Sequence, residues 1–146
     1  MYNMTTENIF EGAEIIYTYT REMALDDGYL VDITEAAGEV GIKYPVAITR
    51  AAWEDCIEWE DADNARKNYN TCQDERGRLH DVVWMLYAAI RAMRNRGQIT
   101  SCFNYELYRV PREGRGFKAR RTTLKAVCGP GDNAEPVITI MLPNEN

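Results

Sequence analysis

The sequence predicts an α+β fold, in which one long buried helix packs on a mixed or antiparallel sheet with a C-terminal three-stranded meander. Two patterns lead to this prediction: an amphipathic helical repeat over residues 79–96, and three strand-like stretches after it that turn residues separate. With 146 residues, 45% of them hydrophobic and 27% charged, the chain has the size and composition of one folded domain. We therefore expect residues 1–146 to form a single domain.

Short elements are predicted for the first third of the chain, each bounded by a capping residue or a glycine. Ile15–Tyr19 is rich in β-branched and aromatic residues, as strands are. Thr20 is expected to cap a short helix that ends at Gly28. Residues 29–33 form an apolar run that predicts a further strand, and Thr34 is expected to cap a second short helix after it.

The middle of the chain predicts an extended segment, a helix and a polar stretch. Residues 44–48 are extended, but Pro45 has no N–H to donate, so we expect an edge strand or a covering segment there. Thr49 is expected to cap a helix over residues 50–60 that has one apolar face. Residues 61–77 are polar and predict either a loop or one exposed helix followed by a loop.

The strongest helix prediction covers Leu79–Arg96. Its apolar residues recur at the i, i+3, i+4, i+7 spacing of one helical face, and Gly97 follows as a C-cap. These apolar residues are Leu79, Val82, Val83, Leu86, Ile90 and Met93. Beyond the helix, residues 99–110 alternate and residues 117–128 are strand-like. Residues 137–142 contain no charge, which predicts a strand buried on both faces.

Charge is distributed very unevenly along the sequence. Residues 1–63, the acidic half, contain fifteen acidic and three basic residues, whereas residues 64–146, the basic half, contain eight acidic and fourteen basic residues. Such asymmetry is typical of a protein with a basic surface for phosphates or acidic partners. No apolar run approaches the roughly 20 residues of a membrane span, and the first residues do not resemble a signal peptide. We therefore expect a cytoplasmic protein with no membrane partner.

The densest basic segment, which we call the basic tract, holds seven cations within seventeen residues. They are Arg109, Arg112, Arg115, Lys118, Arg120, Arg121 and Lys125. Arginines on a hairpin can follow a phosphate backbone while a nearby aromatic ring, Tyr108 or Phe117, stacks on a base. Arg91, Arg94 and Arg96 would extend this surface if the end of the long helix lay beside the hairpin. The alternative is that the tract pairs with the acidic half of the same chain.

Acidic residues border the apolar face of the helix predicted over residues 50–60. Glu54, Asp55, Glu58 and Glu60 form the candidate acidic partner face. A dense acidic face imitates the phosphate charge that a nucleic-acid-binding protein recognises, so it predicts a host protein of that class as a partner. A further interpretation is that acidic and basic faces pair between copies of the chain, which would give a homo-oligomer.

Catalytic and metal-binding patterns are weak. His80 is the one histidine and the candidate general base, but neighbouring helical residues point about 100° apart, so Asp81 is poorly placed to orient it. The four cysteines form no Cys-x-x-Cys pair and, with a single histidine, lack the spacing of a zinc site. We therefore predict no metal and no cofactor, and we favour a binding protein over an enzyme.

Several stretches of the chain, taken together, resemble a known family. They are Ile16–Arg21, Asp27–Asp32, Tyr44–Thr49, Trp53–Glu54, Gly77–Met85, Val110–Arg112, Leu124–Asp132 and Glu135–Pro143. Over residues 9–143 the sequence resembles a family of uncharacterised bacterial proteins, a domain of unknown function common on plasmids, integrative elements and phages. The resemblance implies a bacterial cytoplasmic setting and accessory roles in transfer, maintenance or evasion of host defence. It implies no activity and no role for any single residue.

The sequence supports three functional hypotheses. The first is a non-catalytic binding module of a mobile element, which engages nucleic acid through the basic tract or a nucleic-acid-handling host protein by anti-defence charge mimicry. The second is a small enzyme acting on nucleic acid or a nucleotide, with His80 or a carboxylate moving a proton. The third is a self-assembling structural accessory protein. We favour the first, because phosphate-directed positive charge is visible in the sequence and a catalytic constellation is not.

Overall fold

One mixed sheet organises the protein. The computed structural model describes residues 19–146, so most of the strand expected over Ile15–Tyr19 lies outside the described residues. The sheet has the strand order β1-β2-β5-β4-β3. These strands are β1 (Leu30–Asp32), β2 (Val46–Thr49), β3 (Cys102–Arg109), β4 (Arg120–Pro130) and β5 (Pro136–Met141). The predicted C-terminal meander is confirmed, because β3 pairs antiparallel with β4 and β4 pairs antiparallel with β5.

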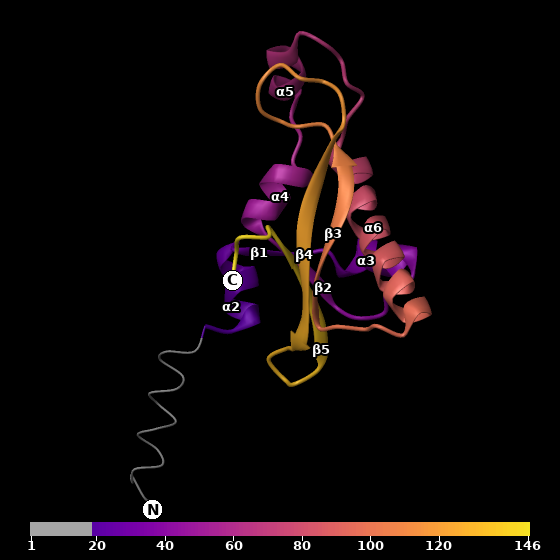
Figure 1. The fold of residues 1–146 in the computed structure, drawn as a ribbon. Coiled ribbons are helices and arrows are strands. Elements are labelled where there is room, and N and C mark those ends of the chain that lie inside the picture. The colour runs from indigo at the N-terminus through magenta and orange to yellow at the C-terminus, as the bar shows by residue number, and fades with distance from the viewer. Residues whose placement is uncertain (1–18) are drawn as a thin grey trace, which may run out of the picture.

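Helices lie on both sides of this sheet (Figure 1). They are α2 (Arg21–Asp27), α3 (Thr34–Val40), α4 (Arg50–Cys56), α5 (Asp61–Lys67) and α6 (Glu75–Arg96). α3 and α6 lie on one side and α2 on the other, while α5 and the loop between β3 and β4 lie together at one end of the molecule (Figure 1). The predicted α+β class with one long helix is therefore confirmed. In the described part of the chain, no helix has the length and apolar character needed to cross a membrane.

β5 is the central strand of the sheet, and it is buried on both faces, as its uncharged sequence predicts. Ile138 and Ile140 are buried on one face, and Val137 and Met141 are buried on the other. β5 pairs parallel with β2 on one side and antiparallel with β4 on the other. A strand with neighbours on both edges and side chains packed on both faces has no room for a charge.

The placement of residues 44–48 at the edge of the sheet was wrong. β2 lies between β1 and β5 and pairs with both of them. Pro45 precedes β2 by one residue, so its missing N–H is not needed by the ladder, and its carbonyl still accepts a hydrogen bond from the Ile138 N–H at 2.9 Å. A proline just before a strand therefore does not exclude that strand from the middle of a sheet.

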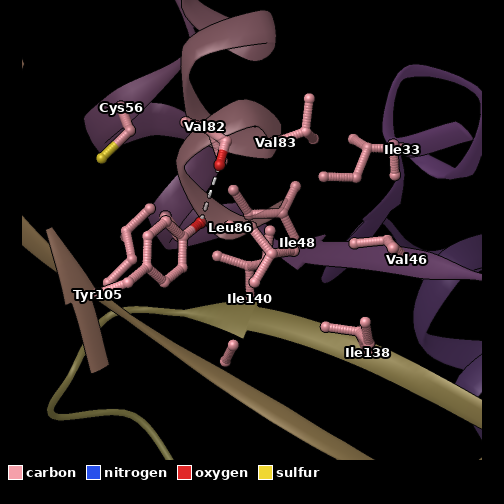
Figure 2. Close-up of a cluster of buried hydrophobic side chains, with 14 of the residues drawn as sticks. Ile33, Val46, Ile48, Cys56, Val82, Val83, Leu86, Tyr105, Ile138 and Ile140 are labelled. Carbon is pink, nitrogen blue, oxygen red and sulfur yellow. Dashed lines mark hydrogen bonds between the residues drawn. The ribbon is translucent and has the colours of Figure 1, made fainter. Parts of the chain in front are cut away.

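The core lies between α6 and the sheet (Figure 2). Val82, Val83 and Leu86 of α6 are fully buried against the sheet residues Ile48 and Ile140. At the edge of this cluster, the Tyr105 hydroxyl donates a hydrogen bond to the Val82 carbonyl at 3.2 Å, so this buried hydroxyl is satisfied (Figure 2).

Burial of the long helix is one-sided. Trp84 is 49% exposed and Met85 36% exposed, although Val83 and Leu86 beside them are fully buried. Trp84 and Met85 are apolar, but they therefore stay at the surface of the helix.

Helix boundaries follow the predicted caps in part. The Thr20 hydroxyl accepts the Met23 N–H at 3.0 Å, and Gly28 ends α2 with a φ of 84°. Thr34 differs from the prediction, because it is the first residue of α3 and its hydroxyl donates to the Asp32 carboxylate at 2.5 Å. α4 ends at Cys56 instead of residue 60, and the polar stretch after it holds a seven-residue helix, α5, followed by a loop.

Candidate functional site

The basic tract covers the far end of the β3–β4 hairpin, except for Lys125, which lies further along β4 opposite Asn104. It begins at the end of β3, where Arg109 lies opposite Arg120 of β4, and it includes the connecting loop over residues 110–119. α5 and the loop that follows it, residues 68–74, lie beside this hairpin loop (Figure 1). We call α5 together with residues 68–74 and 110–120 the tip, which therefore includes Arg120 at the start of β4.

The end of α6 does not extend this surface. α6 leads into β3, and β3 then runs away from the helix end for 8 residues, about 26 Å, before it reaches the tip. Arg91, Arg94 and Arg96 are exposed at that opposite end of the molecule (Figure 1). The possibility that these three arginines join the basic tract is therefore excluded.

Two members of the basic tract are paired with the acidic half of the chain. The Arg109 guanidinium donates to both carboxylate oxygens of Asp55, at 3.0 and 3.1 Å. The Arg112 guanidinium donates to Asp63 Oδ2 at 3.0 Å and also contacts Glu58. These pairs join α4 and α5 to the end of the hairpin, so at these two positions the tract is neutralised from within.

Cationic side chains of α5 and α6 in turn donate hydrogen bonds to backbone carbonyls of the hairpin loop and fix it. Arg66 Nη2 donates to the Arg112 carbonyl at 2.9 Å, and Lys67 Nζ donates to the carbonyls of Glu113 and Gly114 at 3.3 and 3.2 Å. Arg78 Nη1 donates to the carbonyl of Val110 at 2.9 Å. Three cations from α5 and α6 thus hold the backbone of the loop that connects β3 and β4.

Three charged side chains of this network are almost completely buried. Asp63 is 1% exposed, Arg78 3% and Lys67 5%. The Arg78 guanidinium lies 4.8 Å and the Lys67 ammonium 5.9 Å from the centre of the Trp59 ring, a distance at which the ring face attracts a cation. Burial lowers the pKa of both cations, that of Arg78 to about 10. A buried cation held by carbonyls and an aromatic ring is costly to remove, because its acceptors would lose their donor.

Asp63 is the carboxylate at the centre of the network. Burial acts to raise the pKa of its carboxyl, but hydrogen bonds from the Glu60 N–H and from Arg66 and Arg112 outweigh burial and lower that pKa below its ordinary value. The Glu60 N–H lies 2.8 Å from Asp63 Oδ2, which also satisfies a free donor at the start of α5. Asp63 therefore stays ionised, caps the start of α5 and binds Arg66 and Arg112.

The outer members of the basic tract are not neutralised in this way. Arg115, Lys118 and Arg120 are exposed, and within residues 19–146 they form no ion pair. Arg121 lies 3.8 Å from Glu106, but both side chains are more than half exposed, so this pair is weak. Lys125 Nζ donates to the backbone carbonyl of Glu145.

Two aromatic rings are stacked at the surface of the tip. Tyr69 follows α5 and Phe117 belongs to the hairpin loop, and their ring centres lie 4.5 Å apart with planes inclined by 27°. Tyr69 is 53% and Phe117 46% exposed, so neither ring belongs to the core. Arg115 and Lys118 flank Phe117 in the sequence. Cations and stacked aromatic rings are thereby brought together at one exposed place.

The candidate acidic face is divided by the fold. Asp55 and Glu58 turn towards the basic tract and form the pairs described above, whereas Glu54 and Glu60 are exposed. The four residues therefore do not offer one free acidic surface. Burial raises the pKa of the neighbouring Cys56 thiol to about 12, which keeps that thiol protonated and unreactive at neutral pH.

His80 lies away from this network, near the start of α6. Its ring is exposed and lies 6.1 Å from the Trp84 ring, nearly parallel to it. It lines a cleft of about 580 Å³ between α3 and α6, together with Glu39, Cys72, Asp74, Arg76 and Asp81 among others. No group of three or more His, Cys, Asp and Glu side chains in residues 19–146 is arranged to hold a metal ion. A role for His80 as a base stays a prediction.

Sequence reasoning missed the residues that organise the tip. Asp63, Arg66 and Lys67 lie in the polar stretch that was predicted to be a loop, or one exposed helix followed by a loop, and Arg78 precedes the apolar repeat of α6. The one local signal for them is the acid–base spacing of Asp63 and Arg66, which are three residues apart on a helix. Their contacts with the hairpin loop join residues more than forty positions apart and leave no local pattern.

Comparison with known proteins places the whole described structure in one family. A family model described as a family of unknown function (DUF6573) matches residues 6–146. The chain belongs to this family. Its membership confirms the resemblance to an uncharacterised family and adds no role for any residue. Searches of curated proteins and of solved structures found no match.

Proposed function

We propose that this chain is a non-catalytic binding module that engages nucleic acid through the free part of the basic tract, Arg115, Lys118 and Arg120. The observation that supports the proposal is the division of the tract: its inner arginines are held by carboxylates. By contrast, Arg115 and Lys118 of the hairpin loop and Arg120 at the start of β4 are exposed and form no ion pair within the described residues. Exposed cations of this kind release counterions when they meet phosphates, and this release drives binding to nucleic acid.

The fixed loop makes the proposed contacts more effective. The loop carbonyls of Val110, Arg112, Glu113 and Gly114 already accept hydrogen bonds from α5 and α6. A loop that is ordered before binding loses less conformational entropy when the ligand arrives. A basic tip positioned in advance is therefore better suited to binding than a solvated run of cations.

The other hypotheses receive less support from the fold. Charge mimicry requires a free acidic face, and Asp55 and Glu58 are already bound by arginines. Self-assembly through opposite charges competes with the same pairs inside the chain. An enzymatic role for His80 receives little support, since in residues 19–146 no carboxylate is hydrogen-bonded to its ring, which lies beside Trp84. The family resemblance leads us to place the proposed module in the bacterial cytoplasm, as an accessory protein of a mobile element.

The test is a comparison of two triple variants that remove the same charge. R115A/K118A/R120A removes the free cations of the tip, and R91A/R94A/R96A removes three exposed cations at the opposite end of the molecule. Binding to short labelled DNA and RNA is measured by fluorescence anisotropy at low and at physiological salt.

We expect the tip variant to lose most of its affinity and the control to retain it. The dependence of log K on log salt should also become shallower in the tip variant, by about 0.7 to 0.9 for each phosphate contact that is lost. Equal losses of affinity in both variants would mean that binding depends only on net charge, and this would overturn the assignment to the tip. Absence of binding by the unaltered protein at low salt would overturn the proposed function.

A further inference from the structure

We infer that the tip recognises unpaired bases, so that the ligand class is single-stranded nucleic acid, with the stacked Tyr69–Phe117 pair as the platform on which a base stacks. This inference rests on the proposed function and narrows its ligand. Its starting point is a pair of half-exposed rings in face-to-face contact, 4.5 Å apart, beside the cations that the proposal assigns to phosphates.

The two rings are positioned by contacts that do not involve them. The loop that carries Tyr69 is fixed by the Asn64 side-chain oxygen, which accepts hydrogen bonds from the Thr71 N–H at 3.2 Å and the Thr71 hydroxyl at 2.8 Å. The loop that carries Phe117 is fixed three residues earlier, where Lys67 Nζ donates to the Gly114 carbonyl. The ring pair is therefore presented at the surface by two separately anchored loops.

The outer faces of such a pair suit a base. Every base has an apolar ring face, and stacking on an exposed aromatic side chain strengthens binding about tenfold per base, with little dependence on sequence. In a duplex these faces are already stacked on neighbouring base pairs, so the tip could offer a duplex its cations alone.

The charges around the rings also favour a slender ligand. Three free cations, Arg115, Lys118 and Arg120, lie near Phe117 in the sequence, but Glu113 is exposed on the same loop and Asp61 is exposed at the start of α5. A duplex would spread its two phosphate backbones over this mixed surface, whereas a single strand can follow the cations and avoid the carboxylates. Electrostatics and aromatic stacking thus favour the same ligand.

A purely structural reading competes with this inference, since the ring contact also joins the two loops. The experiment must therefore separate stacking on a base from support of the fold. F117L and Y69L keep apolar bulk and remove the aromatic face. Y44L, at a tyrosine that is 51% exposed outside the tip, is the matched control.

Each protein is titrated with four probes of equal length. Two are single strands with bases, one of DNA and one of RNA. The third is a single strand in which abasic sites replace the bases, and the fourth is a duplex. For the unaltered protein we expect tighter binding to the base-containing strand than to the abasic strand or the duplex. F117L and Y69L should weaken binding to the base-containing strand about tenfold and leave the abasic strand, the duplex and the salt dependence unchanged. Y44L should match the unaltered protein. Whichever base-containing strand binds more tightly shows whether the ligand is single-stranded DNA or RNA.

The outcomes distinguish the inference from the function on which it rests. A duplex or an abasic strand bound as tightly as the base-containing strand would overturn the inference and leave nucleic-acid binding in place. So would F117L and Y69L proteins that lose affinity for all probes equally, since this pattern indicates a general loss of loop structure. If no probe binds at low salt, both the proposed function and the inference are wrong.

Discussion

The inner and outer parts of the basic tract contain the same residue type and have opposite environments. Arg109 and Arg112 are held by Asp55, Glu58 and Asp63, and their side chains are 17% and 22% exposed. Arg115, three residues further along, is exposed and forms no ion pair within the described residues. The difference teaches that a run of cations in a sequence is not one structural unit: the inner part attaches the hairpin to α4 and α5, and the outer part stays exposed.

The most severe way to break the inner part is to remove its central carboxylate. D63N keeps the volume of the side chain but leaves Arg66 and Arg112 without their buried counter-charge. We expect the free energy of unfolding to fall by about 3 kcal/mol, since breaking a buried pair leaves the partner charge uncompensated. Urea unfolding measures the change. D61N, an exposed position in the same turn of α5, is the control and should stay within about 0.5 kcal/mol of the unaltered protein. Equal effects at both positions would show that burial of Asp63 carries no special weight.

The comparison is sharpest between Arg112 and Arg115. R112A removes the contacts with Asp63 and Glu58 and should lower the free energy of unfolding by about 2 kcal/mol. R115A should change it by less than about 0.5 kcal/mol, because this side chain is exposed. Nucleic-acid affinity of the folded proteins should respond in the opposite order, with the larger loss in R115A. Similar stability losses in the two variants would remove the distinction on which the proposed site depends.

Acid should weaken the inner part in a defined direction. The pKa of the Asp63 carboxyl is lower in the folded protein than its ordinary value of 3.8. The unfolded state therefore binds a proton first as the pH falls, so the stability that Asp63 contributes is complete above pH 4, roughly, and is lost as the pH falls through the folded-state pKa. We expect the difference in unfolding free energy between the unaltered protein and D63N to be constant near neutral pH and to shrink below about pH 4. If the difference in unfolding free energy between the two proteins stayed constant as the pH fell below about 4, Asp63 would not be ionised in the folded protein.

The smallest effect is expected on the open face of the hairpin. E106A removes the partner of Arg121, at 3.8 Å, in a pair whose side chains are both more than half exposed. Exposed pairs contribute little, because water screens them and both side chains lose freedom on pairing, so we expect a change below about 0.5 kcal/mol. Thermal unfolding at low and high salt checks this. A loss as large as that of R112A would mean that exposure does not separate the two parts of the tract.

Local patterns predicted most of the elements and few of their neighbours. The cap at Thr20 and the uncharged run of β5 could be identified because each depends on residues close in sequence. Pro45 led to an edge position for β2, which was wrong, because the position of a strand in a sheet depends on its neighbours and the proline precedes the paired residues. The apolar repeat of α6 was recognised, but Trp84 shows that the repeat alone does not set the width of the buried face.

The sequence by itself determined the α+β class, the long helix, the C-terminal meander and the concentration of cations between residues 109 and 125. These follow from periodicity, capping and composition, which act over a few residues. Only the tertiary structure decided which cations are free and which aromatic ring lies beside them. Arg109 and Arg112 meet carboxylates that are 54 and 49 residues away, and Tyr69 meets Phe117 from a separate loop. Such pairings depend on which distant segments the sheet and helices bring together, and no local property of the chain encodes those contacts.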